Sequence, residues 1–331
     1  MNQRYNALQQ FVHANTNGMG AHFALEPITG DASFRRYFRL SSDKQCYIVM
    51  DSDPSCVNNH PFIEYNQLFA EQGLRLPHIL SADVAHGFFL LEDLGKIHLA
   101  DLLDEPNIIE HYKQLIDLIP LIARTPAAPS MKSYDTHFVN IELTIFKEWL
   151  VEAFLGMTFS QDECAMWQAA VNFLTSNLLA QPQVTVHRDY HSRNLMFYQQ
   201  QWVVIDYQDA VTGPVSYDLV SLLRDCYHQL PSEQFEVLFE YGYQKLFMAG
   251  LLDGASKAEF TRWFDLVGLQ RHLKAAGIFT RLAQRDQKLG YLPSILPTMV
   301  YIADISSRYT ELSALHQWLV EQIIPTLQER L

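Results

Sequence analysis

The chain of 331 residues has few cysteines and no long apolar segment, and both shortages exclude classes of protein. The cysteines show neither the pattern of a secreted disulfide framework nor the spacing of a zinc site. No apolar run approaches the ~18 residues of a membrane span, and the first residues lack the basic and apolar segments of a signal peptide. We therefore expect reduced thiols, no membrane association and a cytoplasmic location. The four cysteines are Cys46, Cys56, Cys164 and Cys226.

Positive charge is also scarce. The chain has 24 lysines and arginines against 37 aspartates and glutamates, for a formal net charge of -13. Nucleic acids are bound by basic surfaces, so we exclude DNA and RNA as partners. No motif indicates a protein partner, and the negative charge would tolerate a cationic small molecule better than an anionic one. Hydrophobic residues make up 48% of the chain, which is typical of a folded protein, and the length allows two lobes.

The chain does have a polar octet, HRDYHSRN, at residues 187–194 between two apolar runs. The runs are Val184–Val186 and Trp202–Ile205, and Asp206 follows the second. We expect two strands there, forming a hairpin-like unit that brings Asp189, Asn194 and Asp206 to one edge.

These residue types suit phosphoryl transfer. The octet fits the pattern H-R-D-x-x-x-x-N, in which an aspartate accepts the acceptor's hydroxyl proton. Asp189 has that place, and Asn194 and Asp206 are oxygen ligands suited to Mg²⁺. The alternative is an ordinary polar loop between two core strands, but the octet followed by Ile-Asp after a strand is a much rarer pattern.

The octet and the later segment VVIDYQDAVTGPVSYDL resemble the aminoglycoside phosphotransferase and choline kinase family. Within that family, IDYQDAVTGPVSYDLVSLLRDCY is most similar to the bacterial anomeric kinases of N-acetylmuramate and N-acetylglucosamine. The resemblance implies an α+β, two-lobed protein kinase-like fold. It implies a small antiparallel-sheet lobe with the hinge at residues 1–95 and a mostly helical lobe at 96–331. It further implies ATP and Mg²⁺ as cofactors and an amino sugar as acceptor, phosphorylated at its anomeric hydroxyl in cell-wall recycling.

The resemblance also implies roles for residues outside the octet. Ser33, in the loop Gly30–Ser33, would face the ATP phosphates. The Glu92 carbonyl and the Leu94 N–H would bind adenine at the hinge. His187 and Asp218 would support the catalytic loop; from the residues alone, Asp218 is equally well a first-turn acid of a helix.

One departure from the kinase pattern is chemically important. Met50 stands where kinases carry the lysine that binds the α- and β-phosphates. Strand alternation puts Arg36 on one face with Phe34, Phe38 and Leu40, as that face's only charge, so Arg36 is our candidate to reach the phosphates. The alternative is that its head extends into water at the rim of the sheet.

The acceptor side is less defined. The resemblance places the segment QRHLKAAGIFTRL beside the acceptor, which makes Arg271 and His272 candidates for substrate binding, although a basic cluster is also typical of a solvated helix face. Asp209 is a further candidate. Other readings stay open: an aminoglycoside or choline phosphotransferase, a pseudokinase that acts through partners, and a protein kinase. Against the protein kinase, the chain lacks the Asp-Phe-Gly and Ala-Pro-Glu motifs that bracket an activation loop.

Hydrophobic periodicity predicts the remaining elements. Strands are expected at 23–25, 34–40, 46–50 and 88–92. Helices are expected at 3–14, 62–72, 108–122, 141–155, 161–179, 232–249, 258–283 and 309–331.

Overall fold

The computed structural model describes residues 3–16, 25–28, 34–41 and 45–331. The predicted phosphate loop, with Ser33, lies outside the described residues, as does most of the strand predicted at 23–25. The chain divides into two compact units. The first comprises Met1–Leu103 and Arg193–Asp209, and the second Asp104–Ser192 and Ala210–Leu331.

These units differ from the predicted domains in one respect, because residues 96–103 and 193–209 pack with the first unit. Two backbone hydrogen bonds explain the difference. Phe197 N donates to Ile97 O over 2.9 Å, and Val204 N donates to Arg75 O over 2.9 Å. The assignment of nucleotide binding to 1–95 and acceptor binding to 96–331 stays a prediction.

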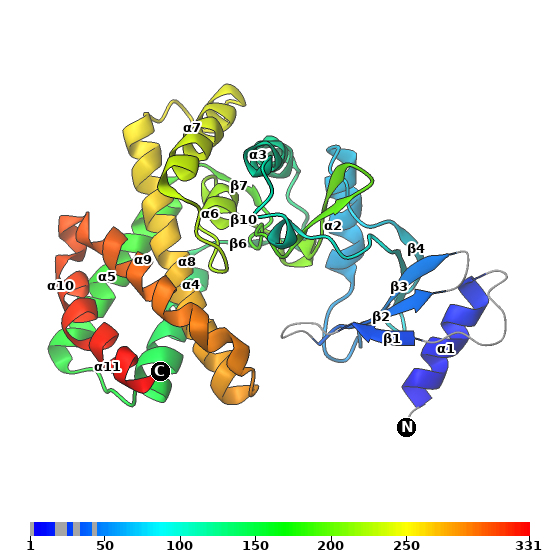
Figure 1. Cartoon of the computed structure of the whole chain (residues 1–331), viewed down its shortest axis with the longest axis horizontal. Coiled ribbons are helices and arrows are strands. Elements are labelled where there is room, and N and C mark those ends of the chain that lie inside the picture. Colours follow the sequence, from blue (N-terminus) through cyan, green and yellow to red (C-terminus); the bar gives the residue numbers. More distant parts are fainter. Residues whose placement is uncertain (1–2, 17–24, 29–33, 42–44) are drawn as a thin grey trace. The chain divides into compact units, whose positions relative to one another are not determined.

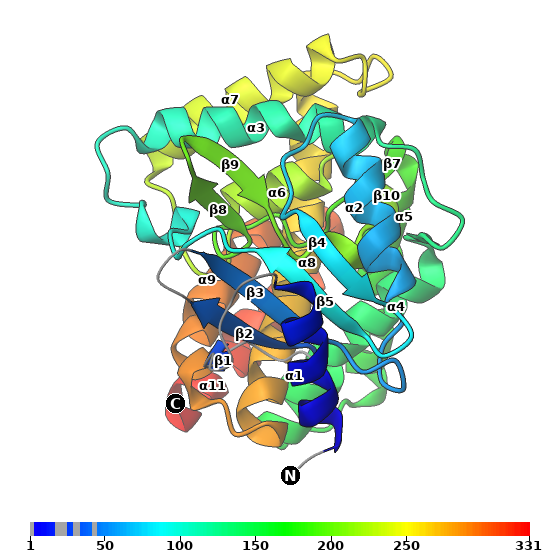
Figure 2. The same cartoon turned by 90° about the vertical axis from the view of Figure 1, so that its right-hand side faces the viewer.

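The first unit is built on a five-stranded antiparallel sheet in the order β1-β2-β3-β5-β4. Its helix α1 (Gln3–Asn15) packs on β5, and the apolar core there includes Leu8, Val12 and Val49 (Figure 2). Helix α2 (His60–Glu71) turns Phe62 toward Phe89 and Tyr207. The strands are β1 (Leu25–Ile28), β2 (Arg36–Ser41), β3 (Cys46–Asp51), β4 (Ile79–Asp83) and β5 (Phe88–Glu92).

A hairpin of β8 (Leu195–Tyr198) and β9 (Gln201–Val204) completes the first unit. Its two turn residues, Gln199 and Gln200, have φ angles of 49° and 61°, as a two-residue type I′ turn requires. Our prediction that the strands flanking the octet form one hairpin-like unit is wrong. The strand before the octet, β7 (Gln183–Val186), pairs instead with β10 (Val211–Pro214) in a three-stranded sheet, β6-β10-β7, of the second unit.

The second unit is mostly helical, and α8 (Lys257–Arg285) is its central element (Figure 1). Helices on several sides contact α8, which explains why its consecutive polar residues 270–272 are buried. The other elements are β6 (Lys132–Ser133), α3 (Ile108–Arg124), α4 (Thr136–Ile145), α5 (Gln161–Ala180), α6 (Tyr217–Leu223), α7 (Ser232–Met248), α9 (Ile295–Ser307), α10 (Ser313–Trp318) and α11 (Ile324–Arg330).

Two predicted helices are interrupted. The helix expected at 141–155 is α4 followed by a π-helical segment, Phe146–Phe154. The helix expected at 309–331 is α10 and α11 with a π-helical turn, Leu319–Ile323, between them. Among the described residues, no helix combines the length and the apolar character needed to cross a membrane.

Candidate active site

The boundary between the two units falls inside the octet, after Ser192, so its two halves have different surroundings. In the second unit, Asp218 in the first turn of α6 accepts hydrogen bonds from two loop amides. The His187 N–H donates over 2.7 Å and the Arg188 N–H over 2.9 Å. At the end of this half, the Ser192 N–H donates to Asp225 over 3.0 Å. Two buried carboxylates thus anchor the loop on either side of Asp189.

Burial raises the pKa of Asp218 to about 7, against the two amide bonds and Arg271, which lower it. His187 is also buried, with its ring edge against Tyr190 at a centroid distance of 5.9 Å. The Tyr190 hydroxyl donates to Leu115 O of α3 over 2.8 Å. These contacts hold the loop to α3 and α6.

Asp189 is partly buried. Burial alone would raise its pKa, but Lys274, Arg188, His191 and Arg271 outweigh that effect and hold the pKa well below its usual range. Asp189 is therefore ionised at neutral pH, and only the ionised form can accept a proton from an acceptor hydroxyl.

A second carboxylate, Glu142 of α4, lies at the centre of a buried polar cluster. Its Oε1 atom accepts from Arg188 Nη2 and Lys274 Nζ, each over 2.7 Å. Its Oε2 atom accepts from Gln270 Nε2 over 2.9 Å and from the Tyr134 hydroxyl. Burial alone would raise the pKa of Glu142, but the positive charges of Lys274 and Arg188 outweigh burial and lower the pKa to about 2. Glu142 is thus an ionised, fully hydrogen-bonded buried group.

In the first unit, Asn194 precedes β8 and Asp206 follows β9, so the two lie side by side at the open end of the hairpin. The Ile205 N–H donates to Asn194 O over 3.0 Å, and Asn194 Nδ2 lies 3.5 Å from Asp206 Oδ2. Gln208 Nε2 donates to Asp206 Oδ1 over 2.7 Å and lies 3.3 Å from Asp209 Oδ2. The hairpin therefore brings the two predicted metal ligands together.

This donor set fits Mg²⁺. Mg²⁺ binds through one or two carboxylates and the phosphates of a nucleotide, rather than through a cage of protein ligands. Among the described residues, no group of three or more His, Cys, Asp or Glu gathers as a metal site. Asp206 and Asn194 would hold the ion, and Gln208 would orient the Asp206 carboxylate.

The predicted nucleotide residues have partners within the first unit. Arg36 forms an ion pair with Asp51, a buried carboxylate that also binds Arg4 over 2.6 Å. Met50 is fully buried in β3. The Arg36 side chain is 51% exposed, so its head is accessible, and its contact with phosphates stays a prediction.

At the predicted hinge, the Glu92 side chain has a structural role that the sequence did not indicate. Arg75 Nη2 donates to it over 2.5 Å and the His78 N–H over 3.2 Å. Burial would raise the pKa of Glu92, and these hydrogen bonds bring it below its ordinary value. Leu94 packs with Met196 and Val203. Adenine binding by the Glu92 carbonyl and the Leu94 N–H stays a prediction.

The predicted acceptor residues belong to different units. Asp209 is exposed and belongs to the first unit. Arg271 is buried, with its guanidinium 5.0 Å from the Tyr217 ring and its Nη1 donating to Arg188 O over 3.2 Å. His272 is buried against the Tyr301 ring at 3.9 Å, and burial lowers its pKa to about 3. These contacts are those of core residues, and substrate binding by the three stays a prediction.

Sequence reasoning missed Glu142, Gln208, Asp225 and Tyr134. Lys274 was recognised as part of the donor run QRHLK beside the acceptor, but not as a partner of Glu142. Glu142 had no local signal, because its partner Arg188 is 46 residues away along the chain.

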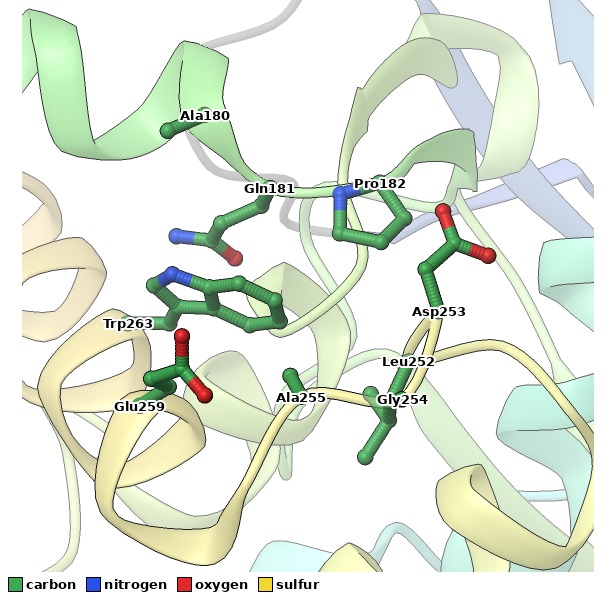
Figure 3. A pocket seen from close by; sticks show the side chains of 9 residues that line it. All are labelled: Ala180, Gln181, Pro182, Leu252, Asp253, Gly254, Ala255, Glu259 and Trp263. Atoms are coloured by element: carbon green, nitrogen blue, oxygen red, sulfur yellow. The ribbon is translucent and has the colours of Figure 1, made fainter.

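A surface pocket of the second unit, near Trp263, contains none of the predicted residues (Figure 3). Two of its polar side chains serve structural bonds. Glu259 accepts from Ser256 N in a helix capping box, and Gln181 accepts from Ser216 over 2.7 Å. The octet is therefore the better candidate for the chemistry.

The model of one protein family, described as the phosphotransferase enzyme family, matches residues 24–251. The chain belongs to this family. This phosphotransferase is 38% identical over 307 residues to an N-acetylmuramate/N-acetylglucosamine kinase of Neisseria meningitidis, with 91% of each chain covered. It is 37% identical over 298 residues to an enzyme of the same name from Pseudomonas putida, covering 90% of this chain and 88% of the relative. The predicted phosphotransferase family is confirmed.

Solved structures show the same fold. Plasmodium vivax ethanolamine kinase has a TM-score of 0.66 at 10% identity, covering 92% of this phosphotransferase and 90% of that chain. An ADP-bound aminoglycoside phosphotransferase has a TM-score of 0.60 at 11% identity, and the match covers 92% of this chain and 98% of that chain. The predicted α+β kinase-like fold is therefore confirmed.

Proposed function

We propose that the protein is a kinase that uses ATP and Mg²⁺ to phosphorylate N-acetylmuramate or N-acetylglucosamine at the anomeric hydroxyl. Two relatives that carry this name, at 37% and 38% identity over about nine-tenths of the chain, support the acceptor. The observation that carries the chemistry is the octet, with Asp189 ionised and anchored between Asp218 and Asp225.

Asp189 accepts the hydrogen bond of the acceptor hydroxyl and takes its proton as the new bond to phosphorus forms. Asn194 and Asp206 hold the metal ion at the β8–β9 hairpin. When bound, Mg²⁺ neutralises the charge that develops on the transferring phosphoryl group. Asp218 fixes the loop through its backbone amides and does not touch the substrate.

A panel of acceptors tests the proposal. N-acetylmuramate, N-acetylglucosamine, choline and kanamycin are each incubated with ATP and Mg²⁺, and the product position is read by phosphorus NMR. We expect an anomeric phosphate on at least one amino sugar. Turnover of kanamycin or choline, with neither sugar phosphorylated, would replace the acceptor and keep the kinase chemistry. Nucleotide binding without transfer to any acceptor would favour the pseudokinase.

The role of Arg36 as the cation that replaces the missing lysine is tested with a matched pair of variants. Arg36 and Arg4 both bind Asp51, so either substitution removes one of its partners. If Arg36 contacts the phosphates, Arg36→Ala weakens ATP binding in calorimetry and Arg4→Ala does not. Equal losses would show that both act through Asp51, and ATP affinity unchanged in Arg36→Ala would end its assignment to the phosphates.

A further inference from the structure

Arg188, the residue before Asp189, has a backbone conformation that arginine rarely adopts. Its φ angle is 77°, in the left-handed region that favours glycine. Such a conformation persists only where the surroundings fix it. An arginine at this position therefore has to contribute something through its side chain that a glycine would not.

The backbone N–H, the carbonyl and the Nη2 atom of Arg188 all have hydrogen-bond partners, whereas its buried Nε has none among the described residues. Its N–H donates to Asp218 over 2.9 Å, and its carbonyl accepts from Ser221 Oγ and Arg271 Nη1, each over 3.2 Å. Its guanidinium binds Glu142 over 2.7 Å and lies 5.0 Å from the Phe138 ring. The peptide groups before and after Arg188 are thus each held by hydrogen bonds, and the second of them leads directly into Asp189.

Glu142 links this loop residue to α8. The same Oε1 atom that accepts from Arg188 also accepts from Lys274, and each distance is 2.7 Å. Lys274 and Glu142 are both buried. A buried charge that loses its partner is strongly unfavourable, so the three side chains hold one another in place.

We propose that Glu142, Arg188 and Lys274 form a positioning triad that holds Asp189 in the orientation required for phosphoryl transfer. The proposal rests on the function proposed above, in which Asp189 accepts the proton. None of the three touches substrate in this scheme; they act through the loop. Loss of the triad should therefore lower kcat and leave ATP binding unchanged. Misplacing a catalytic group by about 1 Å costs about 10²-fold in rate.

Arg188→Gly is the decisive variant, because glycine adopts a φ of 77° without strain and only the side chain is lost. We expect kcat to fall by about tenfold to 10²-fold, with the KM for ATP close to that of the parent. The melting temperature should fall because buried Glu142 loses a partner, although the release of backbone strain offsets part of this loss. Lys274→Gln should lower kcat similarly, and Lys274→Arg should restore part of it by keeping the charge.

Asp265→Asn is the matched control. Asp265 is also a buried carboxylate of α8, and it pairs with Arg308 and Tyr309 instead of the loop. This variant should lose stability and keep kcat. A folded Arg188→Gly variant with the parent's kcat would overturn the proposal, as would an equal fall in kcat for Asp265→Asn.

Amide hydrogen exchange of residues 187–192 separates this proposal from the proposed function. We expect faster exchange in Arg188→Gly and in Lys274→Gln than in the parent, while Asp265→Asn exchanges as the parent does. If the parent phosphorylates no sugar, the proposed function fails and exchange still tests the triad. Unchanged loop exchange in both triad variants would refute the triad even where the sugars are phosphorylated.

Discussion

Arg188 and Asp206, two residues of the candidate site, have positive φ angles of 77° and 63°. Each such conformation costs on the order of 1–3 kcal/mol outside glycine, and such residues cluster at functional sites. At both positions the side chain explains why glycine is absent. Arg188 binds Glu142, and Asp206 lies beside Asn194 and Gln208. Strain is thus retained where a side chain has a function.

Asp206→Gly should separate backbone strain from metal binding. The substitution removes the strain and the carboxylate together, so we expect stability to stay equal or to rise by about 1 kcal/mol. Mg²⁺-dependent ATP binding, measured by calorimetry, should weaken strongly, because hard oxygen ligands are lost. Asp104→Ala removes an exposed carboxylate of the second unit and serves as the control. An unchanged metal dependence would contradict the metal assignment.

Asp189→Asn should affect a different step. The amide cannot accept a proton, so we expect kcat to fall by about 10²–10⁴-fold. ATP binding should stay close to that of the parent, since the proposed contact of Asp189 is with the acceptor. Steady-state kinetics and calorimetry together check this. Turnover within a fewfold of the parent's would remove Asp189 from the mechanism.

At the scale of elements, α8 approaches the junction of α4 and the π-helical segment closely enough to require glycine. A Cβ atom on Gly277 would lie 2.6 Å from the Ile145 carbonyl carbon and 2.7 Å from Phe146 N. In an isolated helix, Gly→Ala would stabilise by about 1 kcal/mol. Here backbone atoms of Ile145 and Phe146 block the methyl group, and backbone atoms shift little. The substitution should therefore destabilise the protein rather than stabilise it.

Gly277→Ala should therefore destabilise the protein by about 1–3 kcal/mol, the usual cost of overpacking a core. Urea denaturation measures the change. Gly290→Ala is the matched control, since no described atom lies within 4 Å of its added Cβ. Equal or higher stability of Gly277→Ala would show that α8 can move away from α4.

Elements with a regular period were predictable from the sequence, and those with local deviations were not. Helix α5 was expected at 161–179 and spans Gln161–Ala180, because its apolar positions follow one helical period. The π-helical segment Phe146–Phe154 was read as ordinary helix, because its wider turn is set by packing against α8 rather than by local pattern. The strand pairing predicted for β7 was also wrong. Its actual partner, β10, lies beyond Asp206, and local sequence does not show that the chain returns there to pair with β7.

The site shows the same division. The octet placed Asp189, Asn194 and Asp206 through local spacing, and the hairpin brings the last two together. The role of Glu142 could not be predicted from the sequence, since only the tertiary fold brings α4 to Arg188 and Lys274. The residues proposed for the chemistry lie in a local motif, whereas Glu142, which is proposed to position them, comes from a distant element.

At the scale of the whole molecule, two buried carboxylates with opposite pKa shifts make opposite contributions to the pH dependence of folding. Lys274 and Arg188, against the effect of burial, bring the pKa of Glu142 to about 2. Its contribution to stability is present above the unfolded value and is lost as the pH falls from about 4.5 toward 2. Burial raises the pKa of Asp218 to about 7, so its native state holds a proton that the unfolded chain has released. Stability from Asp218 therefore falls as the pH rises from about 4 to 7.

Asp218→Asn tests the second contribution. The free energy of unfolding of parent and variant is measured by urea denaturation at several pH values between 4 and 7. All other titrating groups are common to both proteins, so the difference between them isolates Asp218. We expect the parent's advantage to shrink as the pH rises, with a slope of at most about 1.4 kcal/mol per pH unit, because one proton is involved. The two amide bonds from His187 and Arg188 act in the other direction by favouring the ionised carboxylate. An advantage that grows with pH would mean that these bonds outweigh burial and that Asp218 is ionised throughout this range. A constant advantage would mean that its pKa is the same in the folded and unfolded chains, and that Asp218 holds the amides of His187 and Arg188 equally well at every pH in the range.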